Sequence, residues 1–218
     1  DINDGKAVSS ELKKFITEES ESPIEKCRVI NKRGKMYTVY GDEYTVNTRL
    51  LGDEMDGSIN IHNHVKGQSQ YSFSKEDLVE SIRDGSYISY ACDEKYLYTM
   101  IIKNKTPADL AEQLYEEARL EVDDILFHNP ELIPLGDEQH ERIKRACEKL
   151  GIAYKRSKLP WRLLWRIRKA KKRISQYANI ESKYKGFHGR DDRSAKELMD
   201  LTIAFRKRIK TIRDKYNV

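Results

Sequence analysis

The feature of the sequence that most constrains its fold is a change of hydrophobic period at Pro107. Before this residue, from Glu25 onward, short apolar runs alternate with turn residues, and one helix-like segment, 72–85, interrupts them. After it, apolar residues recur every three or four positions, as in helices that bury one face. Strands with one inserted helix, followed by further helices, predict an α+β fold.

Turn residues divide the strand-rich part into separate elements. Residues 25–47 contain two apolar runs around a Lys-Arg-Gly turn and are predicted to form a β-hairpin or a β-meander. Residues 58–64 form a short apolar run that ends at two histidines, and 87–102 are predicted as two strands joined by a tight turn. The segment between them is predicted as a helix because Ser74 suits the N-cap and Gly85 suits the C-terminal end.

A further helix is predicted at 8–19, with Ser9 or Ser10 as its N-cap and apolar residues on one face. A Ser/Glu/Pro stretch ends this helix. The patterns divide the chain into four segments: an N-terminal helix at 1–19, an α+β domain at 20–106, an acidic helical segment at 107–154 and a basic helical extension at 155–218.

The charge of the chain is distributed unevenly. Its 41 Lys/Arg and 36 Asp/Glu give a net charge of +5, yet residues 155–218 contain 21 of the basic and only 6 of the acidic residues. A solvated charged face is the common explanation of such a run, but the excess of positive charge in this helical region also favours a negatively charged partner. This partner is either nucleic acid, bound through counterion release, or an acidic protein surface, such as 107–148 of a second copy in an oligomer. The residues predicted to make this contact are Arg162, Arg166, Lys169, Arg173, Arg206, Lys207 and Arg208.

The sequence also argues against some classes of protein. It contains no run of about 18 apolar residues, so no membrane-spanning segment is predicted, and no basic-then-apolar leader marks a signal peptide. The three cysteines, Cys27, Cys92 and Cys147, are odd in number and lack Cys-x-x-Cys spacing. This pattern predicts buried, reduced thiols and no cysteine-based zinc knuckle, so a cytoplasmic location is expected.

The two histidines that end the apolar run are the strongest candidates for chemistry. Alternate residues of a strand share a face, so His62 and His64 are expected to point to the same side. Neutral imidazoles bind Zn²⁺ well, and a catalytic zinc site needs a third protein ligand. Asp77 supplies this ligand if the chain doubles back after the loop at 65–73. A general base beside the metal would complete a hydrolytic site.

The same residues also have simpler explanations. Histidines at a strand end commonly lie in a partly exposed turn, and Ser74 and Asp77 have ready structural roles as helix N-cap and first-turn carboxylate. The letters His-Asn-His suggest an HNH nuclease, but that motif spreads its residues along a ββα element. Here the helix that follows offers Lys75, Glu76 and Asp77 and no second His or Asn, which disfavours a nuclease.

In their order, these residues resemble the JAB/MPN (JAMM) metallopeptidases, which have a glutamate on an early strand, His-x-His after an apolar strand and Ser-x-x-Asp opening a helix. The corresponding segments are IEKCRVI with Glu25, INIHNH with His62 and His64, and SFSKED with Ser74 and Asp77. The resemblance covers residues 20–103 and extends to the JAB-like domains of bacteriophage head-associated and toxin-like proteins. It implies a cytidine-deaminase-like mixed sheet with flanking helices.

The resemblance also implies roles for the five residues. His62, His64 and Asp77 would bind Zn²⁺, Glu25 would act as the base and then as the acid, and Ser74 would hydrogen-bond the oxyanion. Glu21 is the alternative to Glu25. The reaction implied is hydrolysis of an amide or isopeptide bond in a protein substrate.

The alternative is a catalytically weak or inactive phage structural protein. As a minor head protein in the virion, it would use the basic tail to contact DNA or a capsid or portal partner. Two positions depart from the usual pattern of the family. Val65 stands where the family has proline, and the nine residues between His64 and Ser74 form a longer loop than usual. We interpret the second departure as a loop extension.

Overall fold

The structure, a computed structural model, describes residues 4–65 and 71–159 together with Trp165 and Lys169. Contacts within the chain divide it into two units between Leu159 and Pro160. The first unit contains the strands and helices described below. In the second, the Lys169 ammonium lies 4.5 Å from the centre of the Trp165 ring, and both side chains are exposed. The other predicted contact residues of the basic extension lie outside the described residues.

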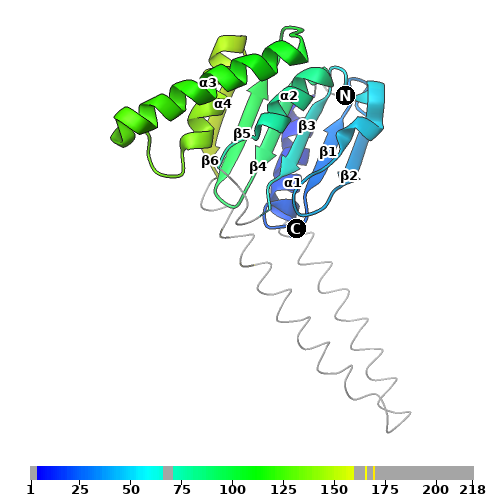
Figure 1. Cartoon of the computed structure of the whole chain (residues 1–218). Coiled ribbons are helices and arrows are strands. Elements are labelled where there is room, and N and C mark those ends of the chain that lie inside the picture. The colour runs from blue at the N-terminus through cyan, green and yellow to red at the C-terminus, as the bar shows by residue number, and fades with distance from the viewer. Residues whose placement is uncertain (1–3, 66–70, 160–164, 166–168, 170–218) are drawn as a thin grey trace, which may run out of the picture. The chain divides into compact units, whose positions relative to one another are not determined.

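The first unit is built on one six-stranded mixed sheet with the strand order β2-β1-β3-β4-β5-β6 (Figure 1). Neighbouring strands are antiparallel except β3 and β4, which are parallel. The α+β class, the mixed sheet and the flanking helices predicted from the sequence are therefore confirmed. The strands are β1 (Lys26–Ile30), β2 (Met36–Tyr40), β3 (Ile59–Asn63), β4 (Ile88–Cys92), β5 (Tyr96–Ile101) and β6 (Ala153–Lys158).

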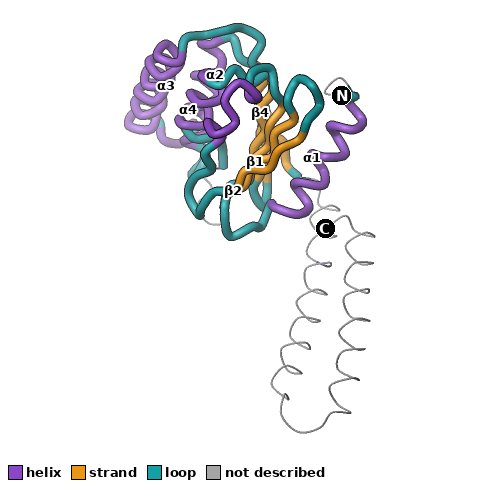
Figure 2. The backbone as a smooth tube through the Cα atoms, turned by 90° about the vertical axis from the view of Figure 1, so that its right-hand side faces the viewer, coloured by secondary structure: helices purple, strands orange, loops and turns teal. Residues whose placement is uncertain are grey.

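Helices cover both faces of the sheet. One helix, α1, lies on one face, and the other α-helices lie on the opposite face, as Figures 1 and 2 show from two directions. Two short 3₁₀ helices lie in connections between these elements. The helices are α1 (Gly5–Glu19), η1 (Thr48–Met55), α2 (Lys75–Arg83), α3 (Ala108–His128), η2 (Pro130–Leu132) and α4 (Glu138–Leu150).

Helix α1 begins earlier than the sequence pattern predicted. The Asp4 side chain accepts hydrogen bonds from the backbone amides of Lys6 and Ala7, at 3.0 and 3.1 Å, so Asp4 is the N-cap in place of Ser9 or Ser10. Phe15 and Ile16 are buried on the sheet side of the helix. The acidic cap satisfies amide groups at the helix start that the predicted serines do not reach.

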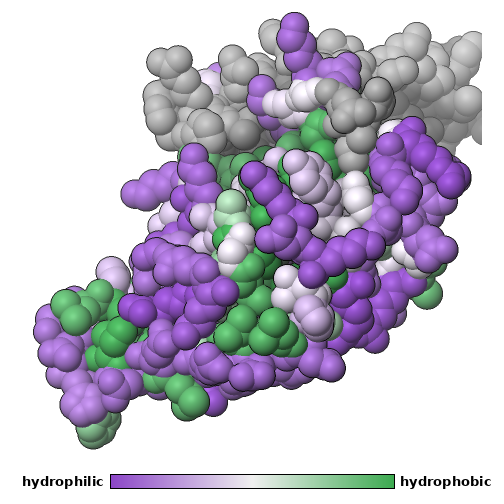
Figure 3. Space-filling view, turned by 90° about the horizontal axis from the view of Figure 1, so that it is seen from above, coloured by the Kyte–Doolittle hydropathy of each residue, from purple (hydrophilic) through white to green (hydrophobic). Residues whose placement is uncertain are grey.

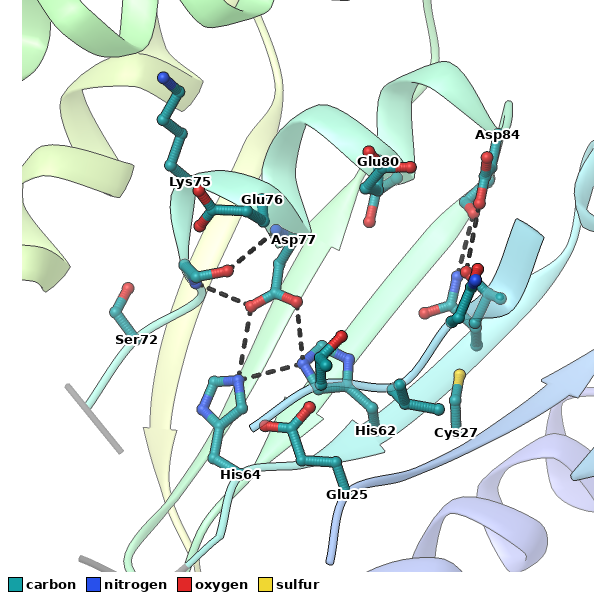
Figure 4. A pocket seen from close by; sticks show the side chains of 18 of the residues that line it. Glu25, Cys27, His62, His64, Ser72, Lys75, Glu76, Asp77, Glu80 and Asp84 are labelled. Atoms are coloured by element: carbon teal, nitrogen blue, oxygen red, sulfur yellow. Dashed lines mark hydrogen bonds and ion pairs between the residues drawn. The ribbon is translucent and has the colours of Figure 1, made fainter. Parts of the chain in front are cut away.

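The connection from β3 to β4 places the carboxyl end of β3 beside the amino end of α2. Because these strands are parallel, the chain must cross over between them, and α2 is part of that crossover. The helix begins after β3 has ended, so the carboxyl end of β3 lies near the amino end of α2. The histidines at the end of β3 therefore lie close to the first turn of α2 (Figure 4).

The largest apolar cluster lies between the sheet and the helices α2, α3 and α4. It joins Phe73 and Leu78 with Tyr98 and Met100 of β5 and with Ile143 of α4, all of them fully buried. The acidic segment predicted at 107–154 thus packs on the sheet. Only the outer faces of its helices carry the acidic charge.

Strand β6 was not predicted from the sequence. It pairs antiparallel with β5, from Ala153 opposite Ile101 to Lys158 opposite Tyr96. The predicted boundary between 154 and 155 therefore falls inside a strand. Residues 155–158, which we had placed in the basic extension, belong to the sheet edge. Their polar, lysine-rich sequence suits an edge strand, which faces water on one side.

One face of the first unit is largely polar. Figure 3 shows hydrophilic side chains over most of the face that it presents, with apolar residues in separate patches. None of the helices among the described residues combines the length and apolarity needed to cross a membrane.

Candidate metal centre

Strand β3 presents two imidazoles on one face of the sheet. His62 and His64 are alternate residues, and their ring centroids lie 4.9 Å apart. Both are buried, with 7% and 9% of their surface exposed. The backbone amide of His64 donates to the Cys92 carbonyl at 2.8 Å, so the ladder between β3 and β4 fixes this residue too.

The first turn of α2 brings a carboxylate to the same point. Asp77 Oδ1 lies 3.3 Å from His62 Nε2, and Asp77 Oδ2 lies 3.4 Å from His64 Nε2. The two Nε2 atoms are 3.0 Å apart. The three predicted ligands therefore converge, and their ligand atoms all lie within 4.8 Å of one another.

Asp77 also belongs to the N-terminal cap of α2. Ser74 Oγ accepts the Asp77 amide at 3.0 Å, and Asp77 Oδ2 accepts the Ser74 amide at 2.7 Å, which forms a capping box. The structural role considered for these two residues is confirmed. The cap holds the Asp77 carboxylate in one orientation, so the same hydrogen bonds that begin the helix aim the carboxylate at the histidines.

The distances between the three groups suit a cation with tetrahedral coordination, such as Zn²⁺. Ligands placed tetrahedrally about 2.0–2.1 Å from one zinc ion lie about 3.3 Å from each other, and the observed separations are 3.0–3.4 Å. Hydrogen bonds alone satisfy this arrangement poorly. Each Nε2 faces two partners at once, and it carries at most one hydrogen. A shared cation would satisfy the His62, His64 and Asp77 contacts together.

The electrostatics of Asp77 follow from this arrangement. Burial opposes ionisation of the carboxyl group, but the interactions with His62 and His64 outweigh burial and hold the pKa of Asp77 well below its usual range. The group is therefore a carboxylate at neutral pH, which is the form that binds a metal ion. His64 Nδ1 is buried and has no hydrogen-bond partner among the described residues. A cation at Nε2 would leave the proton on this nitrogen.

Glu25 lies beside the two histidines, at the amino end of β1. Its carboxyl group points toward the imidazoles in Figure 4. Burial raises the pKa of Glu25 to about 7, the proximity of His64 opposes this rise, and the Asp77 carboxylate adds to it. A carboxyl group with a pKa near neutrality can both take up and release a proton, as general acid–base catalysis requires. The structure thus brings together all five residues of the predicted site.

These residues line a groove of about 1180 Å³, called the first groove below. Strands β1 and β3, the segment 44–49 and helix α2 contribute to it. Asp77 and Ser81 of α2 and its C-cap residue Asp84 line the groove at helical spacing. The groove extends beyond the histidines in both directions along α2, toward Asn60 and toward Tyr115 of α3.

The sequence did not predict the contacts that hold the segment just before α2. Arg156 donates to the Tyr71 carbonyl at 3.4 Å, Ser72 Oγ lies 3.1 Å from the Tyr154 hydroxyl, and Gln139 donates to the Phe73 carbonyl at 3.0 Å. Three consecutive residues are thus each held by a side chain of α4 or β6. No local sequence signal marks these contacts, because the partners lie 66 to 85 positions apart.

None of the three cysteines belongs to the cluster of possible metal ligands found among the described residues. Cys27 lines the first groove, but burial raises the pKa of its thiol far above neutrality, with smaller contributions from Asp77 and Glu25. Burial likewise raises the pKa of the Cys92 and Cys147 thiols. All three are buried and unpaired in disulfides, as predicted. A protonated thiol is a poor nucleophile.

Comparison of the chain with protein-family models, with curated proteins and with solved structures gives no match. The fold is therefore stated at the level of its class, α+β with a mixed six-stranded sheet.

Proposed function

We propose that the chain is a zinc-dependent hydrolase of amide or isopeptide bonds with a JAB/MPN-like fold. The observation that carries this proposal is the convergence of His62, His64 and Asp77, with the Glu25 carboxyl group beside them. Two imidazoles and one carboxylate are a ligand set found in catalytic zinc sites, where a fourth position stays open.

The arrangement of the elements supports the finer fold assignment. A glutamate just before β1, a His-x-His pair at the end of β3 and a Ser-x-x-Asp at the start of α2 follow the order of the family pattern, and β1 and β3 are neighbours in the sheet. The extended loop before Ser74 does not displace the helix start, because side chains of α4 and β6 hold residues 71–73.

A bound zinc ion supplies Lewis-acid chemistry, which makes a water more acidic and a carbonyl carbon more electrophilic. The Glu25 carboxylate takes a proton from the attacking water and later donates it to the leaving amine. Its pKa of about 7 suits both directions of transfer at neutral pH.

Ser74 is placed to assist at the carbonyl oxygen. Its Oγ already accepts the Asp77 amide, but the hydroxyl hydrogen remains available for donation. Because the helix cap fixes Oγ, the donor would be oriented before the substrate binds, and oriented donors of this kind contribute strongly to acyl-transfer reactions.

The dimensions of the first groove favour a macromolecular substrate. Its volume of about 1180 Å³ exceeds the range of roughly 300–1,000 Å³ that is common for small-molecule sites. The groove also continues past the ligand cluster on both sides, as a polypeptide bound across a scissile bond requires.

Hydrolysis of a mixed peptide library by the zinc-loaded chain, read by mass spectrometry in H₂¹⁸O, tests the proposal. We expect new carboxyl groups that carry ¹⁸O, and a loss of roughly 10²–10⁴-fold in rate for Glu25→Gln with zinc retained. Glu21→Gln is the matched control and should cleave like the wild type. Absence of cleavage by the zinc-loaded wild type, on peptide and isopeptide bonds alike, would reject the proposal. Retained cleavage by Glu25→Gln would reject Glu25 as the base.

A further inference from the structure

Asn63 lies between the two histidines, and its side chain is fully buried. We propose that Asn63 is a positioning residue that holds Glu25 opposite the metal ligands, by extending the hydrogen-bonded pairing of β1 and β3 beyond its last backbone pair. The role in catalysis rests on the function proposed above, whereas the structural part of the inference does not.

The Asn63 side chain forms two hydrogen bonds with the backbone where β1 begins, one on each side of Glu25. Its Oδ1 accepts the Lys26 amide at 2.9 Å, and its Nδ2 donates to the Ile24 carbonyl at 3.0 Å. A backbone N–H can only donate and a carbonyl can only accept, so these partners fix the orientation of the carboxamide. The side chain thus presents one acceptor and one donor, as a neighbouring strand would.

The contact begins where the strand pairing ends. Backbone partners of β1 and β3 run from Ile30 opposite Ile59 to Cys27 opposite His62. Residues 24–26 lie beyond that last pair, on the side where Glu25 must face the histidines. The Asn63 carboxamide therefore takes the place of the backbone hydrogen bonds between the two strands at the position where the predicted base, Glu25, lies.

The other side of Glu25 is held by the backbone that follows β2. The Glu25 amide donates to the Asp42 carbonyl at 2.6 Å, and the Gly41 amide donates to the Glu25 carbonyl at 2.9 Å. Hydrogen bonds therefore fix the chain on both edges at this point. Because the backbone is hydrogen-bonded on both sides here, the Glu25 side chain points to the face of the sheet on which the groove lies. The Cys27 side chain, two residues later, points to the same face.

This arrangement matters for catalysis because a general base must lie within hydrogen-bond reach of the proton that it takes. Catalytic groups are held by supporting contacts to within about 0.5 Å of their productive geometry. Residue 63 also follows His62 and precedes His64, so one side chain links the metal-binding strand to the base. A shift of β3 would carry the ligands and Glu25 together.

A second buried asparagine provides a matched control. Asn31 follows β1 at its opposite end, and its Oδ1 accepts the backbone amides of Arg33 and Lys35 at 3.0 and 2.8 Å. It is 2% exposed, so its removal disturbs a buried side-chain contact of the same kind. Asn31 does not line the first groove.

Amide hydrogen exchange of the full chain, followed residue by residue by NMR, tests the structural part. In Asn63→Ala the Lys26 amide should exchange at least about tenfold faster, because it loses its acceptor. The Ile102 amide, which donates to Tyr87, should be unchanged, and Asn31→Ala should leave Lys26 protected. An unchanged Lys26 exchange rate in Asn63→Ala would overturn the inference whether or not the chain is an enzyme.

A double-mutant cycle tests the catalytic part. Asn63→Ala should keep its zinc and lose roughly 10–100-fold in kcat, as is typical when a residue that orients a site is removed. The same substitution in a Glu25→Gln chain should cost nothing further, because it acts through Glu25. An equal loss in both backgrounds, or an equal loss in Asn31→Ala, would assign Asn63 a general structural role instead.

Asn63→Asp removes one of the two hydrogen bonds and keeps the other. It is the variant to measure if Asn63→Ala does not fold. The carboxylate still accepts the Lys26 amide but cannot donate to Ile24. We expect normal protection of Lys26 and a partial loss of kcat. Lys26 protection lost in this variant would contradict the proposed geometry. Failure of the wild type to cleave any substrate would reject the proposed function and leave the exchange result to decide the structural claim.

Discussion

The first unit contains two neighbouring grooves of similar size, which share Arg49, Asp84 and Ser86 in their lining, and their chemistry differs. The first groove, of about 1180 Å³, contains the candidate metal centre. The second, of about 1080 Å³, lies where β3 and β4 begin and where β1 and β5 end, and its lining includes Asn31, Lys32, Asp56, Tyr87 and Lys103. Volume alone does not distinguish them.

The difference lies in how the titratable groups are arranged. In the second groove, charged side chains form a solvent-exposed ion pair. Lys32 Nζ lies 3.0 Å from Asp56 Oδ2, and both side chains are about half exposed. In the first groove, two buried imidazoles and a carboxylate share one point, beside a glutamate whose pKa burial raises to about 7. Convergence of buried titratable groups identifies a functional site better than the size of a cavity.

The largest expected effect is the loss of metal from the first groove. His62→Ala and Asp77→Asn should each abolish stoichiometric zinc binding, because two ligands do not hold zinc tightly. Asp77→Asn keeps an oxygen for the Ser74 amide, so the helix cap survives. Asp56→Asn, in the second groove, should retain zinc. Metal analysis of the purified variants measures their zinc content. Retention of zinc by His62→Ala or Asp77→Asn would show that the first groove does not hold the metal through these ligands.

Ser74→Ala should reduce hydrolysis by roughly 10²–10³-fold, because it removes an oriented donor to the oxyanion. It should also lower the free energy of unfolding by about 0.5–2 kcal/mol, because it removes the N-cap of α2. Asp4→Ala removes the N-cap of α1 and should change stability alone. Ser74→Thr keeps the hydroxyl and should remain active. Equal activity in Ser74→Ala and the wild type would confine Ser74 to its capping role.

The raised pKa of Glu25 predicts a dependence of stability on pH in the metal-free chain. Between pH values of about 4.5 and 7, the unfolded chain loses the Glu25 proton while the folded chain keeps it. The free energy of unfolding should therefore fall as pH rises through this window and stay lowered above it. Glu25→Gln removes the penalty and should be more stable than the wild type by ~1–3 kcal/mol at pH 8. Denaturant unfolding at pH 4 and pH 8 measures this difference, and an equal gain at both pH values would contradict the assigned cause.

The smallest effect is expected in the second groove. Lys32→Ala breaks the exposed ion pair with Asp56, and exposed pairs contribute little to stability. We expect no measurable change in the melting temperature, zinc content or hydrolysis. A clear loss of hydrolysis in Lys32→Ala would show that the second groove takes part in the reaction.

Much of the site could be predicted because its signals are local. Ser74 and Gly85 marked the limits of α2, and the alternation of residues along β3 predicted that His62 and His64 share a face. Asp77 followed from its place in the first turn. These patterns depend only on helix and strand geometry, so one segment of sequence is enough to read them.

The remaining parts depend on contacts that are distant in sequence. The Asn63 side chain meets Ile24 and Lys26 across 39 and 37 positions, and nothing local in His-Asn-His indicates that the middle residue bonds to another strand. Strand β6 was missed because its polar sequence has no apolar run, and it forms by pairing with β5. Sequence periodicity reports which residues are buried, but not which distant backbone group a buried amide will meet.

X-ray absorption at the zinc edge of the zinc-loaded full chain reports the ligands of the metal ion. We predict one zinc environment with two imidazole rings and oxygen ligands at about 2.0–2.1 Å, and no sulfur. We also predict loss of the paired imidazole signal in His62→Ala. A sulfur ligand, an environment without two imidazoles, or zinc that desalting removes from the wild type would contradict the metal centre proposed for His62, His64 and Asp77.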